Sequence, residues 1–289
     1  MVDLQMAKPS KRFSRRRFLI GAGISVATAC AYARWLEPRW LAIRRHEVPL
    51  GGSKPIRLLQ LSDFHASEEV SLDFIEGAVR AGLALKPDLI CLTGDFITWR
   101  FDEFGRYAEV LKPLADVAPT YAVLGNHDGG RWVGTAGYAD TSHVRELLSN
   151  ARIELLHNRT IETHVCGQSI VLVGLGDLWA EEMDPSRAFS SNQANRMESH
   201  SKTILLAHNP DSKDQVATAR WDLMLSGHTH GGQCDLVFFG TPFAPVRDRR
   251  YVRGLHRWRD RWIHVTAGVG NLHGVRFNCR PDIALLTLT

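Results

Sequence analysis

The chain has 289 residues, of which 44% are hydrophobic and 23% are charged, as is usual for a soluble globular protein of one large or two small domains. A net charge of only +4, part of it in the N-terminal segment, gives no indication of nucleic-acid binding. The five cysteines are odd in number, widely spread and without a CxxC pair, which argues against a disulfide framework or a zinc ribbon.

The N-terminal segment has the order of a signal peptide. Basic residues precede an uncharged stretch, Phe18 to Ala33, and the small residues Ala31 and Ala33 would permit cleavage. The alternative is an uncleaved anchor helix, although the stretch is shorter than the ~20 apolar residues of a full membrane span. We therefore expect residues 1–33 to be a signal peptide or an anchor.

The sequence Ser14-Arg15-Arg16-Arg17-Phe18-Leu19 resembles the twin-arginine export signal. This resemblance implies contact with the twin-arginine export machinery and an exported, periplasmic or membrane-associated location in a bacterial envelope. Residues 34–55 are expected to be a connector, whose Trp35 and Trp40 either lie at a membrane surface or pack against the domain. Residues 56–289 are expected to form the main domain.

From Ile56 onwards, apolar runs that read as buried strands end abruptly in polar residues. Three such runs precede potential metal ligands: Ile56–Leu61 leads to Asp63 and His65, Leu89–Leu92 to Asp95, and Tyr121–Leu124 to Asn126, His127 and Asp128. Helices are expected between them, at about 71–85 and 102–114, the second closed by a Pro-containing turn. This alternation of strands and helices predicts an α/β fold.

The second half of the chain repeats the pattern. A helix is expected at 142–148, strands at 170–173, 204–207 and 223–225, another helix near 211–219, and a hairpin around Val252 and Ile263. The strand at 204–207 leads to His208, and the strand at 223–225 leads to His228 and His230. Side chains two apart in an extended segment project to the same side, so His228 and His230 are expected to face one site.

Three further segments each have two interpretations. The Gly-rich loop Gly129 to Thr141 either lines a substrate groove or is plain surface. The polar segment Trp179 to Ser201 either caps the site or is a mobile insertion. The seven arginines between Arg247 and Arg261 either lie on a solvated surface or contact anionic lipid or phosphate.

The polar residues at the strand ends form one candidate site, because sites in open α/β sheets form at the carboxyl ends of strands. The set is Asp63, His65, Asp95, Asn126, His127, His208, His228 and His230. Imidazole with carboxylate suits Mn, Fe, Zn or Co, whereas an all-oxygen shell would favour Mg or Ca. Because a carboxylate can bridge two ions ~3.5–4 Å apart, the ligand types predict two divalent transition-metal ions.

In this order, the motifs resemble the calcineurin-like metallophosphoesterase superfamily. The matching blocks are Asp63-x-His65, Gly94-Asp95, Gly125-Asn126-His127-Asp128, Ala207-His208 and Gly227-His228-Thr229-His230. The resemblance covers the chain from about residue 56 to its end. It implies a four-layer αββα sandwich and a phosphoric ester hydrolase in which a metal-bridging hydroxide attacks phosphorus.

The resemblance also implies individual roles. Asp63, His65 and His230 would hold one metal, Asn126, His208 and His228 would hold the other, and Asp95 would bridge them. His127 would contact the phosphate or protonate the leaving oxygen, and Asp128 would orient His127.

The Gly231-Gly232-Gln233 tail and the twin-arginine start resemble exported bacterial phosphodiesterases near the UDP-2,3-diacylglucosamine pyrophosphohydrolases. This implies a phosphodiester or lipid-linked diphosphate substrate of the envelope, at the membrane surface. Hydrolysis of UDP-2,3-diacylglucosamine in lipid A synthesis is an alternative, although export conflicts with a cytoplasmic substrate. An acylated substrate would need an apolar groove, for which the candidates are Trp99, Phe101, Trp132 and Trp179.

Two hypotheses compete with an envelope phosphodiesterase. A non-catalytic scaffold with the same fold would usually have lost ligands, and this chain keeps all of those expected. A nuclease would need an extended basic surface, which only the stretch from Arg247 to Arg261 offers, and we expect no nucleic-acid partner.

Overall fold

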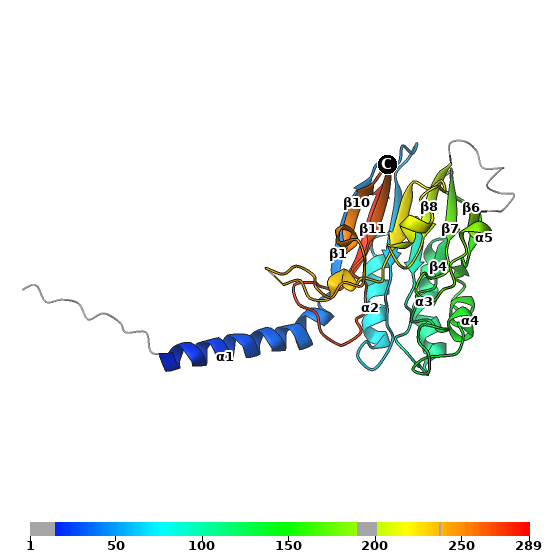
Figure 1. The fold of residues 1–289 in the computed structure, drawn as a ribbon. Helices are drawn as coiled ribbons and strands as arrows, with labels where there is room; N and C mark the ends of the chain where they lie inside the picture. The colour runs from blue at the N-terminus through cyan, green and yellow to red at the C-terminus, as the bar shows by residue number, and fades with distance from the viewer. Residues whose placement is uncertain (1–14, 190–200, 237) are drawn as a thin grey trace, which may run out of the picture.

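The computed structural model describes residues 15–189, 201–236 and 238–289, and its main body consists of two six-stranded sheets packed face to face (Figure 1). The first sheet has the order β1 (Ala42–Val48), β12 (Asp282–Leu288), β2 (Ile56–Leu61), β3 (Leu89–Thr93), β4 (Thr120–Val123) and β5 (Glu154–Leu155). The second has the order β10 (Gly254–Trp258), β11 (Arg261–Val265), β9 (Leu223–Ser226), β8 (Lys202–Leu206), β7 (Gln168–Gly174) and β6 (Arg159–Val165).

One apolar core lies between the sheets and a second lies under the helices that cover the first sheet. Leu58 and Leu89 of the first sheet pack with Leu172 and Leu206 of the second. The outer face of the first sheet is covered by α2 (Leu72–Leu83), α3 (Phe104–Val117) and α4 (Ser142–Asn150). Strands with apolar side chains on both faces require exactly such cover on each side, which explains the unbroken apolar runs of the sequence.

The outer layer over the second sheet is thinner. It consists of the short helices α5 (Pro185–Phe189) and α6 (Ser212–Gln215), together with Trp221 stacked on Trp258 at 5.4 Å between ring centroids. The guanidinium of Arg261 lies over the ring of Trp221, so part of the arginine-rich stretch is used in packing. The expected αββα arrangement is confirmed, with one helical layer well developed and the other short.

The expected strands are all observed, and the structure differs from the expectations based on the sequence in three places. The stretch expected to be a connector, residues 34–55, contains β1, which is an edge strand of the first sheet and pairs in parallel with β12. Helix α3 continues through Pro113 to Val117, because the exposed position of Pro113 leaves the lost hydrogen bond to solvent. The helix expected near 211–219 is only the short α6.

A helix that projects from the two sheets forms the N-terminal part of the described chain (Figure 1). It comprises α1 (Arg15–Ala31), η1 (Tyr32–Leu36) and η2 (Glu37–Arg39), and α1 buries no residue. Within the described residues, the continuous run Arg15–Arg39 is long and apolar enough to cross a membrane, a criterion that signal sequences also meet. The helical run is therefore longer than the apolar stretch expected from the sequence, while Ser14 of the twin-arginine motif lies outside the described residues.

Directly beneath the ends of the strands, a polar network joins the two sheets. The Nδ1–H of buried His264 on β11 donates to Oε1 of Gln60 on β2 at 2.7 Å. The amide of Gln60 donates in turn to Oγ1 of Thr93 at 3.0 Å and to the carbonyl of Ser226 at 2.9 Å. Because every one of these groups is buried, a second proton on His264 would place a positive charge inside this network, which is unfavourable.

We expect His264 to make stability fall in acid. Burial lowers its pKa to about 3, whereas an unfolded histidine titrates near 6.5, so the unfolded chain binds the extra proton first as pH falls below about 6.5. This linkage should cost about 2 kcal/mol between pH 6.5 and 5. Urea unfolding in EDTA at pH 6.5 and pH 5 measures this loss of stability. In His264→Asn, whose amide can replace the Nδ1–H donor, the loss should be about 2 kcal/mol smaller than in the wild type. An identical loss in both proteins would contradict the role assigned to His264.

Candidate metal centre

Strands of both sheets deliver the expected site residues from their carboxyl ends. In the first sheet β2, β3 and β4 run parallel, and in the second β8 and β9 run parallel. Asp63 and His65 follow β2, Asp95 follows β3, and the remaining ligands follow β4, β8 and β9. The expected convergence at the strand ends therefore occurs, between the two sheets rather than at the edge of one.

The backbone at these strand ends adopts an unusual conformation. Five of the seven expected metal ligands have positive φ angles: Asp63 (50°), His65 (50°), Asp95 (55°), His228 (69°) and His230 (51°). Residues other than glycine seldom adopt this left-handed region, and such strain is concentrated at functional sites. Here it occurs in the segments that follow β2, β3 and β9.

Two glycines let the backbone of neighbouring loops pack directly against the carboxylates. A Cβ on Gly125 would collide with Oδ1 of Asp95, and a Cβ on Gly227 would collide with Oδ2 of Asp63. The glycines in the Gly-Asn-His-Asp and Gly-His-Thr-His motifs are thus required by the close approach of the backbone to these carboxylates.

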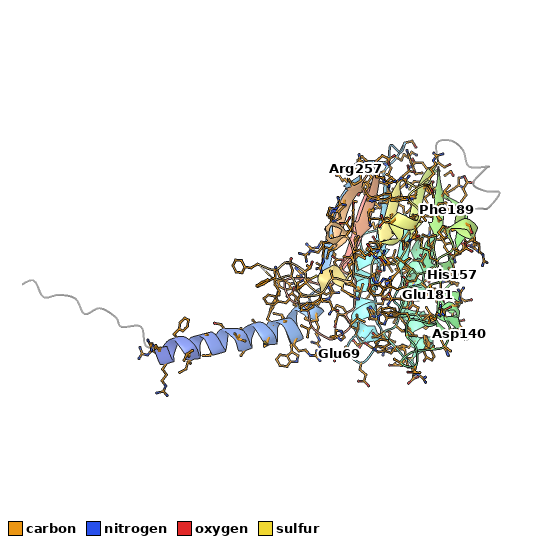
Figure 2. The ribbon with its side chains drawn as sticks, in the orientation of Figure 1. Glu69, Asp140, His157, Glu181, Phe189 and Arg257 are labelled. Atoms are coloured by element: carbon orange, nitrogen blue, oxygen red, sulfur yellow. The ribbon has the colours of Figure 1, made fainter. Side chains whose placement is uncertain are left out.

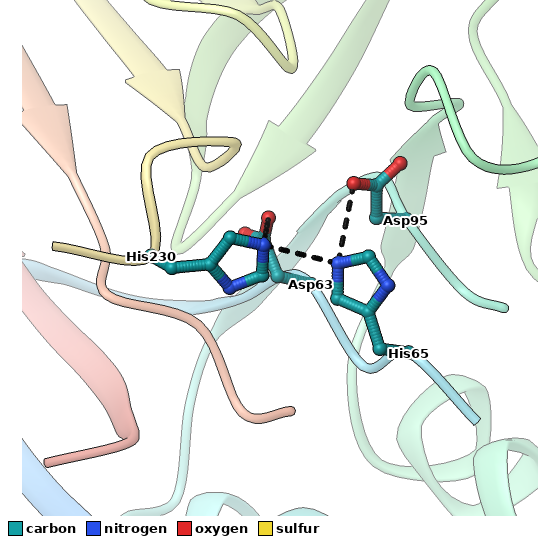
Figure 3. A group of neighbouring side chains, drawn as sticks. All are labelled: Asp63, His65, Asp95 and His230. Atoms are coloured by element: carbon teal, nitrogen blue, oxygen red, sulfur yellow. Dashed lines mark hydrogen bonds and ion pairs between the residues drawn. The ribbon is translucent and has the colours of Figure 1, made fainter. Parts of the chain in front are cut away.

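The carboxylate of Asp95 lies between histidines of the two sheets, and its contact with His65 is drawn in Figure 3. Its Oδ2 lies 3.3 Å from Nε2 of His65 and 3.1 Å from Nε2 of His208, so that it faces one histidine from each sheet. Its Oδ1 accepts the backbone N–H of His127 at 2.9 Å. One oxygen is thereby fixed to the first sheet's own loop, and the other is presented to the middle of the site.

Asp63 joins the sheets in the same manner. Its Oδ1 accepts the backbone N–H of His228 at 2.8 Å and lies 3.7 Å from Nε2 of His230. Nε2 of His230 lies 3.1 Å from Nε2 of His65 (Figure 3). The potential ligand atoms of Asp63, His65, Asp95 and His230 all lie within 4.8 Å of one another, which is close enough for one ion to contact them together.

Backbone carbonyls and a hydroxyl set the tautomers of three histidines. Nδ1–H of His208 donates to the carbonyl of Thr93 at 2.7 Å, and Nδ1–H of His127 donates to the carbonyl of Thr98 at 2.7 Å. The hydroxyl of Thr98 donates its one proton to the carbonyl of His65 at 3.2 Å, so it accepts from Nδ1 of His65 at 3.3 Å. In each ring Nε2 is the atom left for a ligand, as in most metal-binding histidines.

Burial and charge perturb the titration of the cluster in opposite directions. Burial lowers the pKa of His65 to about 4 and raises the pKa of Asp63 to about 7. Burial alone would raise the pKa of Asp95, but the charges of His208 and His127 hold that pKa well below its usual range. Burial alone would lower the pKa of His208, but the charge of Asp95 raises it well above its usual value. Asp95 and His208 thus form an ion pair, in which a proton on His208 occupies the position that a metal would take.

Four buried atoms test whether these residues fit metal ions. Among the described residues, buried atoms of four expected ligands have neither a hydrogen-bond nor an ion-pair partner: Asp63 Oδ2, Asn126 Oδ1, His228 Nε2 and His230 Nδ1. A buried polar atom without a partner is costly, and four of them in one group of oxygen and imidazole donors match the ligands of divalent transition metals. The residues present therefore fit a metal centre.

His127 and Asp128 are both in the site, but Asp128 does not have the role expected of it. Oδ2 of Asp128 accepts the backbone N–H groups of Asp95 (3.0 Å) and Gly125 (2.8 Å), and its Oδ1 accepts that of Phe96 (2.6 Å). The carbonyl of Thr98, rather than Asp128, orients the ring of His127. Asp128 instead ties the loop after β3 to the loop after β4, since its carboxylate is saturated by backbone donors.

Arg276 is a supporting residue that sequence reasoning missed. Its guanidinium is fully buried and donates to backbone carbonyls of the two loops beside Asp63 and His230: those of His230, Ala267, Gly268, Gly270 and Cys279. Gly268 and Gly270 pack against Asp63 and Phe64. No pattern near Arg276 in the sequence signals this function, because its partners are carbonyls that any residue could supply.

The comparisons with known proteins agree with this geometry. The profile of the calcineurin-like phosphoesterase family matches residues 56–232. Phosphodiesterase YaeI of Escherichia coli is 41% identical over 95% of this chain and 99% of its own length. An uncharacterised metallophosphoesterase, YkuE of Bacillus subtilis, is 29% identical over 96% of this chain and 98% of its own length.

A more distant relative has a named substrate. UDP-2,3-diacylglucosamine pyrophosphatase LpxG of Chlamydia trachomatis is 26% identical over 88% of this chain and 91% of its own length. With the family profile covering more than half of the chain, the chain belongs to the calcineurin-like phosphoesterase family. It is a metallophosphoesterase, a hydrolase of phosphoric esters, and its buried Asp/His cluster fits a dinuclear metal site.

We expect metal removal to destabilise the protein through this cluster. EDTA should lower the melting temperature of the full chain in detergent, and Mn²⁺ or Zn²⁺ at 100 times its Kd should restore about 2.7 kcal/mol of stability. In Asp95→Asn this response should be largely lost, whereas Asp88→Asn, outside the site, should keep it. Scanning fluorimetry with elemental analysis measures both effects. A protein that contains no metal and whose melting temperature does not change with EDTA would contradict the assignment of a metal centre.

Proposed function

We propose that the chain is a phosphodiesterase or pyrophosphohydrolase of the cell envelope, acting on a phosphodiester or a lipid-linked diphosphate. The observation that carries this proposal is the metal-type cluster itself, with an uncommitted histidine, His127, beside it. Its ring centroid lies 5.0 Å from that of His65 and 4.8 Å from that of Trp99.

Each of the two ions would have ligands from both sheets, one ion mainly from the first sheet and the other mainly from the second. Asp63, His65 and His230 would hold one, Asn126, His208 and His228 would hold the other, and Asp95 would bridge them. When bound, the two ions would supply Lewis-acid stabilisation of charge on the phosphate and an activated water. The central position of Asp95 Oδ2 and the unpaired atoms of Asn126 and His228 support this division.

His127 would act on the phosphate or on the leaving oxygen. Its Nδ1–H is held by the carbonyl of Thr98, which leaves Nε2 to accept or donate a proton. The side chain is buried but not sealed, with 7% of its surface exposed. A histidine fixed at one nitrogen and accessible at the other is suited to protonate a departing alkoxide.

Three tryptophans line the approach to the histidines, which supports a substrate with an apolar or flat part. Trp179 lies edge-on against His228 with ring centroids 4.2 Å apart, and Trp132 from the Gly-rich loop lies 4.6 Å from Trp179. Trp99 and Trp132 are both more than two-fifths exposed. Phe101, the fourth candidate, packs between Phe104 and Tyr107 instead and belongs to the helical core.

The proposal predicts hydrolysis of bis-p-nitrophenyl phosphate by the metal-loaded protein. His127→Ala should lose about 10²–10⁴-fold in kcat, because proton transfer is removed, while its metal content stays unchanged. His164→Ala, an exposed histidine on β6, is the matched control and should keep wild-type activity. Full turnover by His127→Ala would contradict the proposed role of His127. A metal-loaded wild-type protein without activity would contradict the proposed phosphodiesterase function.

The source of the substrate is inferred from the relatives and the N-terminus. YaeI is named a phosphodiesterase and LpxG a UDP-2,3-diacylglucosamine pyrophosphatase. The latter activity, at the membrane in lipid A synthesis, is the second candidate for this chain and would suit a protein that is anchored without export. Parallel assays on an envelope phospholipid, UDP-2,3-diacylglucosamine and DNA separate these substrates, and we expect no turnover of DNA.

We also propose export through the twin-arginine machinery, supported by the Arg15-Arg16 pair at the start of an apolar helix. Arg15→Lys together with Arg16→Lys should retain the protein in the cytoplasmic fraction, because the machinery reads the arginine pair. The same two changes at Arg44 and Arg45, an exposed pair on β1, should leave the location unchanged. Cell fractionation measures this, and an unaltered distribution of the Arg15/Arg16 variant would refute export by this route.

A further inference from the structure

A pocket of about 360 Å³ adjoins the metal centre on the side of the histidine motif. It is bounded by three segments that are distant in the sequence: His230 and Gln233, Phe243 and Pro245, Leu272 and Val275. His230 belongs at once to this pocket and to the metal-type cluster. A ligand with its phosphate at the cluster therefore has an adjacent, largely apolar compartment for the rest of its structure.

The pocket is built by the Gly-Gly-Gln tail that follows the histidines in η3 (His230–Gly232). Gly232 has a φ of 81°, and a Cβ there would collide with Cβ of Thr241. Oε1 of Gln233 accepts the backbone N–H of Leu272 at 3.2 Å, and its carbonyl accepts the N–H of Phe277 at 2.9 Å. Gly232 thus lets the segment around Thr241 pack closely against the tail, and Gln233 links the tail to the segment from Leu272 to Phe277.

Residues 238–246, here termed the aromatic loop, present three phenylalanines to solvent. Phe238, Phe239 and Phe243 are 91%, 79% and 71% exposed. At the start of this loop, the backbones of Leu236 and Gly240 exchange hydrogen bonds of 2.7 Å in both directions. Three large apolar side chains exposed this close together indicate a partner surface or an apolar phase, because leaving them in water is unfavourable.

The apolar N-terminal helix docks beside the same pocket. The carbonyl of Ala33 accepts the backbone N–H of Arg276 at 2.9 Å, and the rings of Tyr32 and Phe277 meet edge to face at 6.4 Å. Arg34 pairs with Glu69, which lies at the base of the helix in Figure 2. In Figure 1 the gold loop after η3 projects from the domain on the same side as α1. Helix, loop and pocket therefore share one face.

Charge at the base of the loop fits a bilayer better than a neutral apolar surface. The guanidinium of Arg249, in η4 (Arg249–Tyr251), donates to the carbonyls of Thr241 and Pro242. Arg250, next to it, has a side chain that is 76% exposed and pairs with Asp248 at 2.6 Å. Because one carboxylate, that of Asp248, accompanies the two arginines, the base of the loop keeps a positive charge behind the phenylalanines. This is the order of anionic headgroups and acyl chains in a membrane.

We propose that this pocket binds the alkyl chain of a lipid phosphodiester whose phosphate lies at the metal centre, and that the aromatic loop enters the bilayer to admit it. The inference rests on the proposed function. Beyond that function, we infer that the enzyme recognises the alkyl chain of the substrate, that the pocket residues bind this chain, and that the substrate comes from the bilayer.

Two soluble probes test the pocket with the full-length, metal-loaded enzyme. Methyl and octyl p-nitrophenyl phosphate share the reacting bond and differ only in seven methylenes, and both are used below the micellar concentration. The wild type should favour the octyl ester roughly tenfold or more in kcat/KM, because the tail leaves water. Phe243→Ser with Leu272→Ser should reduce that preference at least about fivefold and leave the methyl rate within about twofold.

Val117→Ser, which changes an exposed apolar residue at the end of α3, is the matched control and should keep the octyl preference. An enzyme that hydrolyses both esters equally, or a double variant that keeps the preference, overturns the pocket assignment. If the wild type hydrolyses neither ester, the proposed function has failed instead.

Vesicles containing phosphatidylglycerol test the aromatic loop. With dodecyl p-nitrophenyl phosphate held in the bilayer, Phe238→Ser with Phe239→Ser should lower the rate at least about fivefold. The same variant should hydrolyse monomeric octyl ester at the wild-type rate, because its pocket is intact. An unchanged rate on vesicles would show that the loop does not enter the membrane, as when another protein covers it.

Discussion

The structure depends on a single buried carboxylate that faces histidines from two different sheets. Oδ2 of Asp95 lies just over 3 Å from an imidazole nitrogen of His65 and from one of His208. His208 donates its other ring N–H to the carbonyl of Thr93, and His65 contacts the hydroxyl of Thr98 through its own Nδ1. The Nε2 atoms of both rings are therefore directed to the place where a cation would lie. The two sheets are thus joined electrostatically at the point where their strands end, and a bound metal would satisfy both of them at once.

Support for this centre comes mainly from the backbone. Carbonyls of Thr93 and Thr98 orient histidines, backbone N–H groups saturate Asp128, and Arg276 holds the carbonyls of the loops around Asp63. Left-handed φ angles at the ligands are unfavourable on their own, and they persist because these contacts over-determine the loops. Main-chain support also leaves the side chains around the site free to vary, so that the aromatic and apolar surroundings can follow the substrate.

Much of the site could be predicted from the sequence, because strand ends deliver ligands and the ligand types identify the chemistry. Asp63, His65, Asp95 and His230 lie together as the pattern required. The sequence could not reveal which atom orients His127, since a carbonyl such as that of Thr98 carries no signature. It also placed the strand β1 in a connector, because β1 joins the sheet by pairing with β12, about 240 residues later in the chain. Pairing at such separations leaves no local pattern.

We propose that Asp95 would bridge two divalent ions. Anomalous diffraction from crystals of the metal-loaded protein, recorded on both sides of the absorption edge of the metal, tests it most directly. The account predicts two peaks ~3.5–4 Å apart, with Asp95 in contact with both, one peak next to His65 and His230 and the other next to His208 and His228. A single peak, or peaks that leave Asp95 without contact, would contradict it.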